Sequence, residues 1–437
     1  MCLLRYAGAA QISVTAQPGA HLLGREGREI ASGSGPWTFS VTAKDVNTSN
    51  GKDGVQVTDA KGKRLSVLEA AQHWRVQLDD GAAQIGLRGS GSATRHYHGS
   101  LEIRVASGQL RLINEVCMEP YLQGVVISEI GDGPLEALKA QVIAARTYAI
   151  SSRGRWKADG YDLRDSVDSQ AYNGIEAETP EGNRAVRETT GQILTVNGQP
   201  IDSDFCDDCG GVTAPGDDPA ILPRSVSDAE AHRNIRRAPY TNWTLSLSPE
   251  RLKALLSSNA KARGVGTLQS VEIAQRDVSG RAQRVRMLWG VGRAPAAQPT
   301  DSDSKPDSKG GSDSRSTLPS RHLSRRHTDD QNSRDDSSGN ASAVTAATEL
   351  DGEHFRATVG YNILRSTLFT VHRAANGDFV FEGHGWGHGH GLCQQGALAL
   401  AAPPLNQNSK TILAHYYPGA RLTFWQAAEE EGLPHGG

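Results

Sequence analysis

The sequence lacks several features that mark common classes of protein. No stretch approaches the ~20 consecutive apolar residues that a transmembrane helix needs. The formal net charge is only −3, so no excess of basic charge points to nucleic acid or to an anionic membrane surface. Aromatic residues make up 5% of the chain, whereas 48 of its 437 residues are glycine. This composition predicts many short elements and turns, arranged in two or three domains or in one large mixed fold with insertions.

Cysteine is also scarce, and the number of cysteines is odd. An odd number does not fit a framework of disulfide bonds, so we expect thiols. Cys117 lies in an apolar, strand-like run and is expected to be a buried core thiol. The start of the chain, MCLLRYAGAAQ, is too short for a convincing signal peptide, so the sequence does not itself indicate export. The five cysteines are Cys2, Cys117, Cys206, Cys209 and Cys393.

Residues 121–150 contain two helical patterns separated by a Gly-Asp-Gly break at 131–133. Pro134 suits the first position of the second helix, where its missing N–H costs nothing. Apolar residues recur at helical spacing after Pro134, which predicts that one face of the second helix packs in a hydrophobic core. Lys139 and Arg146 lie seven residues apart, on one side of this helix.

One carboxylate, Glu129, stands just before that break. In the first helical pattern it shares a stripe with Leu122 and Val126, so it lies next to the apolar face in the last turn. The negative end of the helix dipole and partial burial both favour the protonated form of this acid. A general acid needs that property near neutral pH. The alternative that spacing alone allows is a solvated glutamate at a helix end.

The rest of the chain predicts a fold rich in β-structure. Residues 11–118 form short alternating runs separated by turns, and the last run, Leu110–Val116, leads into the helical segment. A helix around Pro180–Thr190 precedes a hairpin whose turn is Asn197-Gly198. Residues 243–292 again read as strands with one short helix.

A sharp change in composition follows. From Pro299 to Ala341 the chain is dominated by Ser, Asp, Arg and Lys and cannot bury a core, so we expect it to be disordered. It should interrupt one fold, because the β pattern before it resumes after it. The predicted class is α+β, with a central helical pair, antiparallel β units and this insert. The expected divisions are an N-terminal β-rich region (1–98), a mixed region in two parts (99–298 and 346–425), the insert (299–345) and a tail (426–437).

A C-x-x-C pair, Cys206 and Cys209, follows the hairpin in the run CDDCGG. Such a pair can supply half of a tetrahedral zinc site or act as a redox couple. A complete zinc site needs further ligands, and His232 is the nearest candidate in the sequence. Asp207 and Asp208 would make a redox thiolate harder to form, which weakens the redox interpretation.

A second dense motif, GHGWGHGHGLCQQGALALA, spans residues 383–401. Its alternating glycines let the backbone adopt positive φ and pass close to a ligand. Trp386 can stack on a sugar face or on an aromatic group, and the histidines, His388 among them, offer proton donors or metal ligands. A helix begins near Cys393 and carries Gln394 at its start. The alternative is a set of tight turns with incidental histidines, which three histidines and a tryptophan among five glycines disfavour.

The run YLQGVVISEIGDGPLEALKAQVIAARTYAI, together with GHGWGHGHGLCQQGA, closely resembles the stage II sporulation protein D (SpoIID/LytB) family. Shorter segments match in the right order: YDLRDSVDSQAYNG, the CGG of CDDCGGVT, LRST and ILAHYYPGA. The resemblance covers roughly residues 99–422, apart from the low-complexity insert. The sequence departs from the family pattern at Ile130 and Leu392, where methionine is usual, at His390, where valine is common, and at Cys393, where serine usually precedes glutamine.

The family's sporulation members are lytic transglycosylases, which cut peptidoglycan glycan strands from which the stem peptides have been removed. The resemblance implies that Glu129 is the catalytic acid/base and that the protein acts outside the cytoplasm. Ordinary glycosidases need two carboxyl groups. A lytic transglycosylase can use one, because the 6-hydroxyl of muramic acid attacks the anomeric carbon and gives a 1,6-anhydro end. No cofactor is required, but some members bind zinc near the CGG segment, so a structural zinc at Cys206 and Cys209 stays open. The residues assigned to substrate binding are Lys139, Arg146, Tyr148, Asp165, Gln170, Tyr172, Trp386, His388, Gln394 and Tyr416.

Two other functions stay open. The LytB side of the family is described as stimulating a partner amidase, so the chain could be a non-catalytic, wall-binding enhancer of an N-acetylmuramoyl-L-alanine amidase. The other is a metal-dependent hydrolase, in which His388 and His390 would converge with Cys206. The glycan-cleaving interpretation requires that Glu129 and His388 share a cleft.

Overall fold

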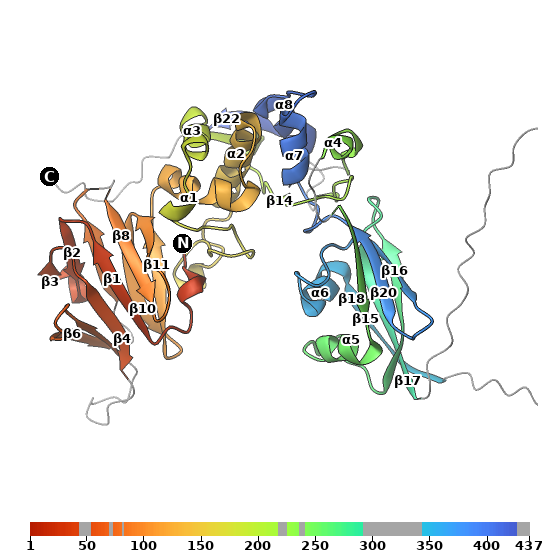
Figure 1. The fold of residues 1–437 in the computed structure, drawn as a ribbon, viewed down its shortest axis with the longest axis horizontal. Coiled ribbons are helices and arrows are strands. Elements are labelled where there is room, and N and C mark those ends of the chain that lie inside the picture. Colours follow the sequence, from red (N-terminus) through yellow and green to blue (C-terminus); the bar gives the residue numbers. More distant parts are fainter. Residues whose placement is uncertain are drawn as a thin grey trace, which may run out of the picture.

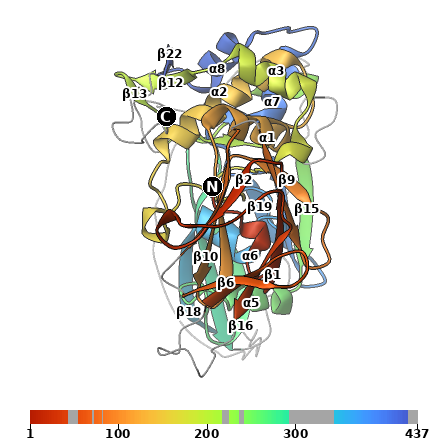
Figure 2. The same cartoon turned by 90° about the vertical axis from the view of Figure 1, so that its left-hand side faces the viewer.

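The computed structural model shows a mixed α+β architecture, as predicted (Figure 1). Two β-rich parts lie on either side of a group of helices. Figure 2 shows these helices as a layer at one end of the molecule. The structure describes residues 1–42, 54–69, 73–80, 83–216, 225–235, 241–291 and 343–425. The predicted tail, 426–437, and residues 299–342 of the predicted insert lie outside these ranges.

The N-terminal part is a sandwich of two antiparallel sheets, with strand orders β6-β5-β4-β1-β8-β9 and β11-β10-β7-β2-β3. Buried side chains alternate as a half-buried strand requires: Ile12 and Val14 of β1, and Trp74 and Val76 of β7, are fully buried. An edge-to-face contact joins the two inner faces, with the ring centroids of Phe39 and Trp74 6.1 Å apart. The strands are β1 (Gln11–Ala16), β2 (Ala20–Leu23), β3 (Glu29–Ser32), β4 (Trp37–Thr42), β5 (Gly54–Thr58), β6 (Arg64–Glu69), β7 (Trp74–Leu78), β8 (Gln84–Gly89), β9 (Arg95–His98), β10 (Ser100–Ala106) and β11 (Gln109–Glu115).

The sandwich continues through β11, past the division predicted at residue 98. Helix α1 (Met118–Ile130) follows almost at once, and Cys117 is its N-cap residue. The prediction that Cys117 is a buried core thiol is therefore wrong, because β11 ends before it and its side chain is exposed.

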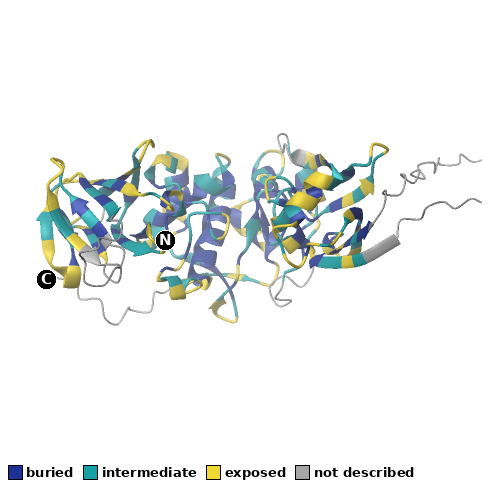
Figure 3. Cartoon of the chain, turned by 90° about the horizontal axis from the view of Figure 1, so that it is seen from below, coloured by how far each residue is buried: buried dark blue, intermediate teal, exposed yellow. Residues whose placement is uncertain are grey.

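The predicted helical pair is present. Helix α1 ends at Gly131, whose φ of 72° lies in the left-handed region that favours glycine. Helix α2 (Leu135–Ser151) begins one residue later than predicted, with Pro134 as its N-cap. Its small residues allow close packing on several sides, against α1, α3 (Pro180–Glu188), α7 (Gln394–Ala401) and α8 (Ser409–Tyr416). Figure 3 shows this helical layer as largely buried, so α2 forms the centre of the packing.

The second β-rich part has a hydrophobic core of its own, separate from the core shared by the sandwich and the helices. Strands β17 and β18 pair antiparallel although residues 292–342 separate them in the sequence, which confirms that the low-complexity stretch interrupts one fold. Residues 343–345, predicted to lie in the insert, begin β18. The elements are β15 (Asn242–Leu247), α5 (Pro249–Leu256), β16 (Thr267–Arg276), β17 (Ala282–Val291), β18 (Ala343–Asp351), α6 (Gly352–Val359), β19 (Phe369–Arg373) and β20 (Phe379–His384).

After β20 the chain returns to the first core. Strand β21 (Leu392–Cys393) pairs in parallel with β14 (Phe205–Cys206), and β22 (Arg421–Phe424) pairs with β12 (Gln192–Val196). The hairpin of β12 and β13 (Gln199–Pro200) turns at Asn197-Gly198, as predicted. The short helix α4 (Ala229–Asn234) packs on α7. This return brings the second dense motif, residues 383–401, beside α1 and α2, and it is called the Gly/His motif below. None of the described helices is long and apolar enough to cross a membrane.

Candidate active site

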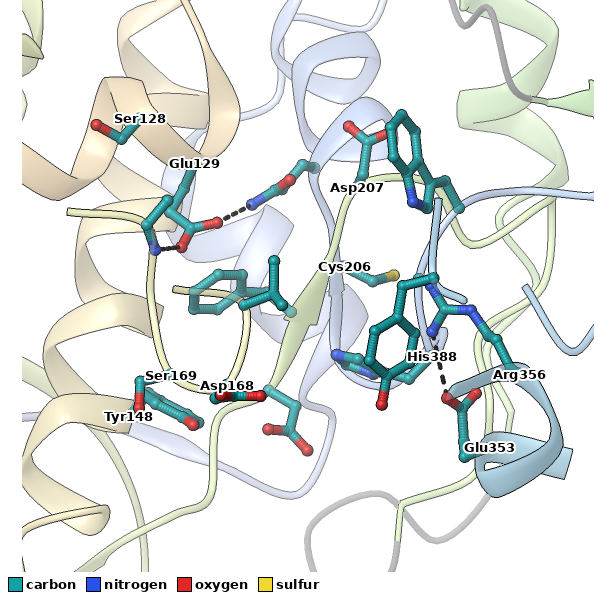
Figure 4. A pocket seen from close by; sticks show the side chains of 18 of the residues that line it. Ser128, Glu129, Tyr148, Asp168, Ser169, Cys206, Asp207, Glu353, Arg356 and His388 are labelled. Carbon is teal, nitrogen blue, oxygen red and sulfur yellow. Dashed lines mark hydrogen bonds and ion pairs between the residues drawn. The ribbon is translucent and has the colours of Figure 1, made fainter. Parts of the chain in front are cut away.

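A central cavity of about 780 Å³ lies where the helical layer meets the second β-rich part (Figure 4). Residues from α1, from the loops around residues 155 and 168, from β14 and α6, and from the Gly/His motif line this cavity. The size falls within the ~300–1,000 Å³ that is common for ligand sites. Of the residues predicted from the sequence, Glu129, Tyr148, Cys206, Trp386, His388 and Gln394 line the central cavity. Glu129 and His388 thus share a cleft, as the glycan-cleaving interpretation requires.

Glu129 occupies the last turn of α1, next to its apolar face. Its side chain is half-buried and points into the central cavity (Figure 4). One carboxyl oxygen accepts a hydrogen bond from the backbone N–H of Ala171, and the other lies 3.5 Å from the Nε2 of Gln394. The carboxyl group is therefore held from two sides, by segments that are distant in the sequence.

The surroundings of Glu129 favour its protonated form. Burial is the main cause, and it raises the pKa of Glu129 from 4.5 to about 7, with a further contribution from the negative charge of Asp207. The hydrogen bonds from Ala171 and Gln394 oppose this rise, because they stabilise the carboxylate. A carboxyl group with this pKa can donate a proton at neutral pH and accept one later in the same reaction.

Two neighbouring glutamines in the first turn of α7 hold two carboxyl groups of the central cavity. Gln394 reaches Glu129, and the Nε2 of Gln395 donates to an oxygen of Asp207 at 3.1 Å. Burial raises the pKa of Asp207 as well. The sequence indicated Asp207 only as a neighbour of the C-x-x-C cysteines, and its place in the cavity follows from the parallel pairing of β14 with β21.

The rim of the cavity combines aromatic and basic side chains that sequence analysis missed. Trp156 and Tyr361 line it together with Trp386, and Tyr361 is 42% exposed. Arg155 and Arg356 also line the cavity, and the guanidinium of Arg356 lies 4.7 Å from the centroid of the Tyr361 ring and pairs with Glu353, another lining residue, at 3.2 Å. Carboxyl groups outnumber these two cations in the lining, so the aromatic faces, rather than the net charge, suit a ligand with apolar ring faces.

His388 stabilises the backbone conformation of the Gly/His motif. Its Nδ1 accepts the backbone N–H of His390 at 3.0 Å, and the two rings stack with centroids 5.3 Å apart. Burial, together with His390 and Arg356, lowers the pKa of His388 to about 3. The imidazole is therefore neutral under ordinary conditions, and it can donate a hydrogen bond but does not add a positive charge to the cavity.

Two basic residues assigned to substrate binding lie away from the cavity lining. Lys139 forms ion pairs of 2.8 Å with Glu136 and 2.5 Å with Glu188. The guanidinium of Arg146 is 1% exposed and bonds both carboxyl oxygens of Glu119, at 3.0 and 2.6 Å. These contacts tie the helices together, so the geometry gives both residues a structural role and does not favour contact with substrate.

Four further residues assigned to substrate binding are also absent from the cavity lining, because each is held behind it by internal hydrogen bonds. The side chain of Asp165 pairs with Arg5 at 3.1 Å and is 1% exposed. The other three are fully or almost fully buried. They are Gln170, which bonds Tyr121 and Ala145, Tyr172, which bonds Asn114, and Tyr416, which bonds Asp228.

The C-x-x-C pair separates in the structure. Cys206 lies against Gly387 and lines the central cavity. Cys209 instead joins His232, as predicted from the sequence, and also Asp208 and Cys393. Across the described chain, these four are the residues whose ligand atoms gather as a metal site would require. Cys206 is not a member, which corrects its assignment as a ligand. His388 and His390 are not members either, so the metal site of the hydrolase interpretation does not form.

Comparisons with known proteins agree with this architecture. The family model SpoIID, described as stage II sporulation protein, matches residues 106–196. That range contains the helical pair, with Glu129 and Tyr148, and ends before β14 and the Gly/His motif.

Three curated relatives extend the similarity. An uncharacterized protein of Brachyspira hyodysenteriae is 26% identical over 77% of this chain and 75% of its own length. The amidase enhancer of Bacillus subtilis is 26% identical over 69% of this chain, and the stage II sporulation protein D of the same organism is 31% identical over 23% of it. The matches span 40% of the amidase enhancer and 34% of the stage II sporulation protein D. Together, the family model and these relatives show a stage II sporulation protein D (SpoIID) domain at residues 106–196 and support a relationship of the chain to the SpoIID family.

Proposed function

We propose that the protein is a lytic transglycosylase that cleaves peptide-free glycan strands of peptidoglycan, with Glu129 as its acid/base. The observation that carries the proposal is the setting of this one carboxyl group. It projects into the central cavity, it is held by Ala171 and Gln394, and its pKa is raised to about 7. Such a group starts the reaction protonated at neutral pH and can take a proton back within the same turnover.

The proposed reaction needs no second carboxyl group. Glu129 protonates the glycosidic oxygen that links N-acetylmuramic acid to N-acetylglucosamine, and the bond from this oxygen to the anomeric carbon breaks. The 6-hydroxyl of the same muramic acid forms a new bond to that carbon and gives its proton to the Glu129 carboxylate. The products are a 1,6-anhydro-muramyl end and a free 4-hydroxyl, no water is consumed, and Glu129 is protonated again. The reaction requires no metal or other cofactor.

The rim of the cavity supports this class of substrate. Trp156, Tyr361 and Trp386 offer aromatic faces for pyranose rings. Muramic acid without its peptide exposes a lactyl carboxylate, and Arg155, which lines the cavity, is a cation that can pair with it. A peptide-bearing strand lacks this free carboxylate, so such a pair would favour glycan strands from which an amidase has already removed the peptides. A substrate of this kind places the protein outside the cytoplasm.

A second candidate is a non-catalytic protein that binds the cell wall and stimulates an amidase. The similarity to the amidase enhancer of Bacillus subtilis favours it. In that case the central cavity binds glycan but does not cleave it, and the partner is the amidase.

The products distinguish the candidates. Peptidoglycan is treated with an amidase to completion, the amidase is inactivated, and the purified protein is added. The proposal predicts soluble disaccharides with 1,6-anhydro ends by mass spectrometry. Reducing ends that carry ¹⁸O from labelled water would instead show hydrolysis, and would direct attention to Asp207 as a second carboxyl group. Binding without any cleavage, combined with faster amidase action on intact wall, would establish the enhancer and refute the proposal.

A further inference from the structure

The carboxyl group of Glu129 is held by a loop that contacts two parts of the molecule. The backbone N–H of Ala171 donates to it, and Ala171 belongs to residues 165–178, which we call the 165–178 segment. This segment has no regular structure apart from a 3-10 turn at Ile175–Ala177. A loop of this kind is fixed by the groups that it contacts. Those contacts therefore decide whether the Ala171 N–H points at Glu129.

Gln170 binds the segment to the helical layer. Its side chain accepts the hydroxyl of Tyr121 of α1 at 2.7 Å and donates to the carbonyl oxygen of Ala145 of α2 at 3.2 Å. Gln170 is fully buried, so water does not compete for these two hydrogen bonds. The residue directly before Ala171 is thus fixed to both central helices.

Tyr172, the residue directly after Ala171, packs against both α1 and the sandwich. Its ring lies against Gly124 of α1, where an added Cβ would stand 2.7 Å from the Cε2 of Tyr172. Its hydroxyl donates to the Oδ1 of Asn114 in β11 at 2.9 Å, and its ring centroid lies 5.8 Å from that of Tyr97 in β9. Tyr172 is 1% exposed, so these contacts set its position.

Arg5, which precedes the first strand of the sandwich, binds the segment at several points. Its guanidinium donates to the carbonyl oxygen of Tyr172 at 2.9 Å and to the Oδ1 of Asn173 at 2.8 Å. It also pairs at 3.1 Å with Asp165, whose side chain is 1% exposed. Two more contacts come from β9, in which His96 bonds Glu176 at 2.7 Å and His98 bonds Glu178 at 2.8 Å. The N-terminal part thus contacts the segment from its first residue to its last.

Most of the sandwich lies outside the range that the family model matches, which begins at residue 106. We propose that this sandwich, together with Gln170, positions the 165–178 segment so that the Ala171 N–H stays directed at Glu129. Gln170 and Tyr172 are then positioning residues, since neither of them lines the central cavity. The proposal rests on the function proposed for Glu129 and gives the sandwich a part in the same site.

The Ala171 N–H affects the carboxyl group in two ways. It stabilises the carboxylate of Glu129 and so lowers the pKa of this group, against the effect of burial. It also restricts the orientation of the carboxyl group, on which proton transfer to a substrate depends. Loosening the segment should therefore raise the pKa of Glu129 further and lower kcat. KM should change little, because the residues that line the cavity are kept.

Two substitutions loosen the segment from behind the cavity. Tyr172→Phe removes the hydroxyl that bonds Asn114. Gly124→Ala adds a Cβ that displaces the Tyr172 ring, whereas alanine favours the helical state of α1. In each variant the pKa of Glu129 should rise by about 0.5, which is a roughly threefold gain in proton affinity. The measurement is a ¹³C NMR titration of the full chain with labelled glutamate carboxyl groups, in which Glu129→Gln identifies the resonance of Glu129.

Activity and a matched control accompany the titration. On peptide-free glycan strands, kcat of both variants should fall about three- to tenfold, with KM within about twofold of wild type. Thr189→Val is the control, because it also removes a buried hydroxyl, but one that bonds Ala185 of α3 and does not contact the segment. It should leave the pKa of Glu129 unchanged.

An unchanged or lower pKa of Glu129 in the folded variants would overturn the proposal. Tyr172→Phe keeps the aromatic ring, so it decides the question alone if Gly124→Ala does not fold. The titration needs no substrate. It therefore decides this proposal even if the wild type cleaves no glycan, which is the result that would refute the reaction proposed for Glu129.

Discussion

Glu129 and Gln394 lie 265 residues apart in the chain, and the Nε2 of Gln394 approaches a carboxyl oxygen of Glu129 to 3.5 Å. The contact joins the last turn of α1 to the first turn of α7. It exists because β21 pairs with β14 and returns the chain to the helical layer. The carboxyl group proposed as the acid/base, at the end of one helix, is thus contacted by an amide donor at the start of another.

The pH dependence of activity follows from the raised pKa of Glu129. The proposed reaction begins with the protonated acid, and burial keeps that form populated up to about pH 7. Above this pH, kcat/KM should fall about tenfold per pH unit, because one proton is required. The same shift lowers the stability of the folded state as the pH rises from 4.5 to about 7, since the folded state holds a proton that the unfolded chain releases. A pH–rate profile on peptide-free glycan strands that stays flat from pH 6 to 9 would contradict this assignment.

Gln394→Ala should move the decline of kcat/KM at alkaline pH, the alkaline limb of the profile, to higher pH. The Gln394 side chain stabilises the carboxylate of Glu129, so its removal raises the pKa of Glu129 further. Turnover should fall as well, because the carboxyl group is held less firmly. Gln395→Ala is the matched comparison, since Gln395 contacts Asp207 instead, and it should not shift the limb upward. Equal profiles for the two variants would show that the contact between Gln394 and Glu129 has no role.

Tyr361→Ala tests the aromatic rim. Tyr361 is 42% exposed, so its removal should leave the fold intact. The loss of one stacking face should raise KM about two- to tenfold, which corresponds to ~0.5–1.5 kcal/mol, with little change in kcat. Phe424→Ala, at an aromatic side chain that is 71% exposed and does not line the central cavity, is the control. An unchanged KM in Tyr361→Ala would show that the glycan does not stack on the Tyr361 ring.

Arg146→Met should damage stability rather than glycan binding. The guanidinium is 1% exposed and paired with Glu119, and breaking a largely buried pair costs about 3 kcal/mol. Urea unfolding should show this loss, whereas glycan affinity per folded molecule should stay within twofold of wild type. A folded variant of wild-type stability that binds glycan poorly would restore Arg146 as a substrate-binding residue.

Local features were the easiest to predict from the sequence. The helical pair, the Asn197-Gly198 hairpin and the acid at the end of α1 all depend on spacing within one or two turns of chain. The place of Tyr361 and Arg356 in the cavity could not be predicted, because it depends on how α6 lies against the helical layer. Arg146 was wrongly expected to bind substrate. Its spacing on the helix did not show that Glu119, on another helix, pairs with it.

The residues around Cys209 illustrate the same limit. The C-x-x-C spacing suggested that Cys206 and Cys209 act together, but the strand pairing of β14 places Cys206 at the cavity and leaves Cys209 beside Cys393. Cys393 comes 184 residues after Cys209, and no local pattern connects them. The one sequence signal was the cysteine that stands where relatives usually carry serine.

Glu129→Gln tests the central claim most directly. Glutamine has the shape of glutamate and can still accept the Ala171 N–H, but it cannot donate and recover a proton. Release of 1,6-anhydro products from peptide-free glycan strands should fall by a factor of about 10²–10⁴, while glycan binding and the melting temperature at pH 6 stay near wild type. Glu181→Gln, an equivalent change at an exposed carboxylate of α3, should retain full activity. Equal product release by wild type and Glu129→Gln would show that Glu129 is not the acid/base.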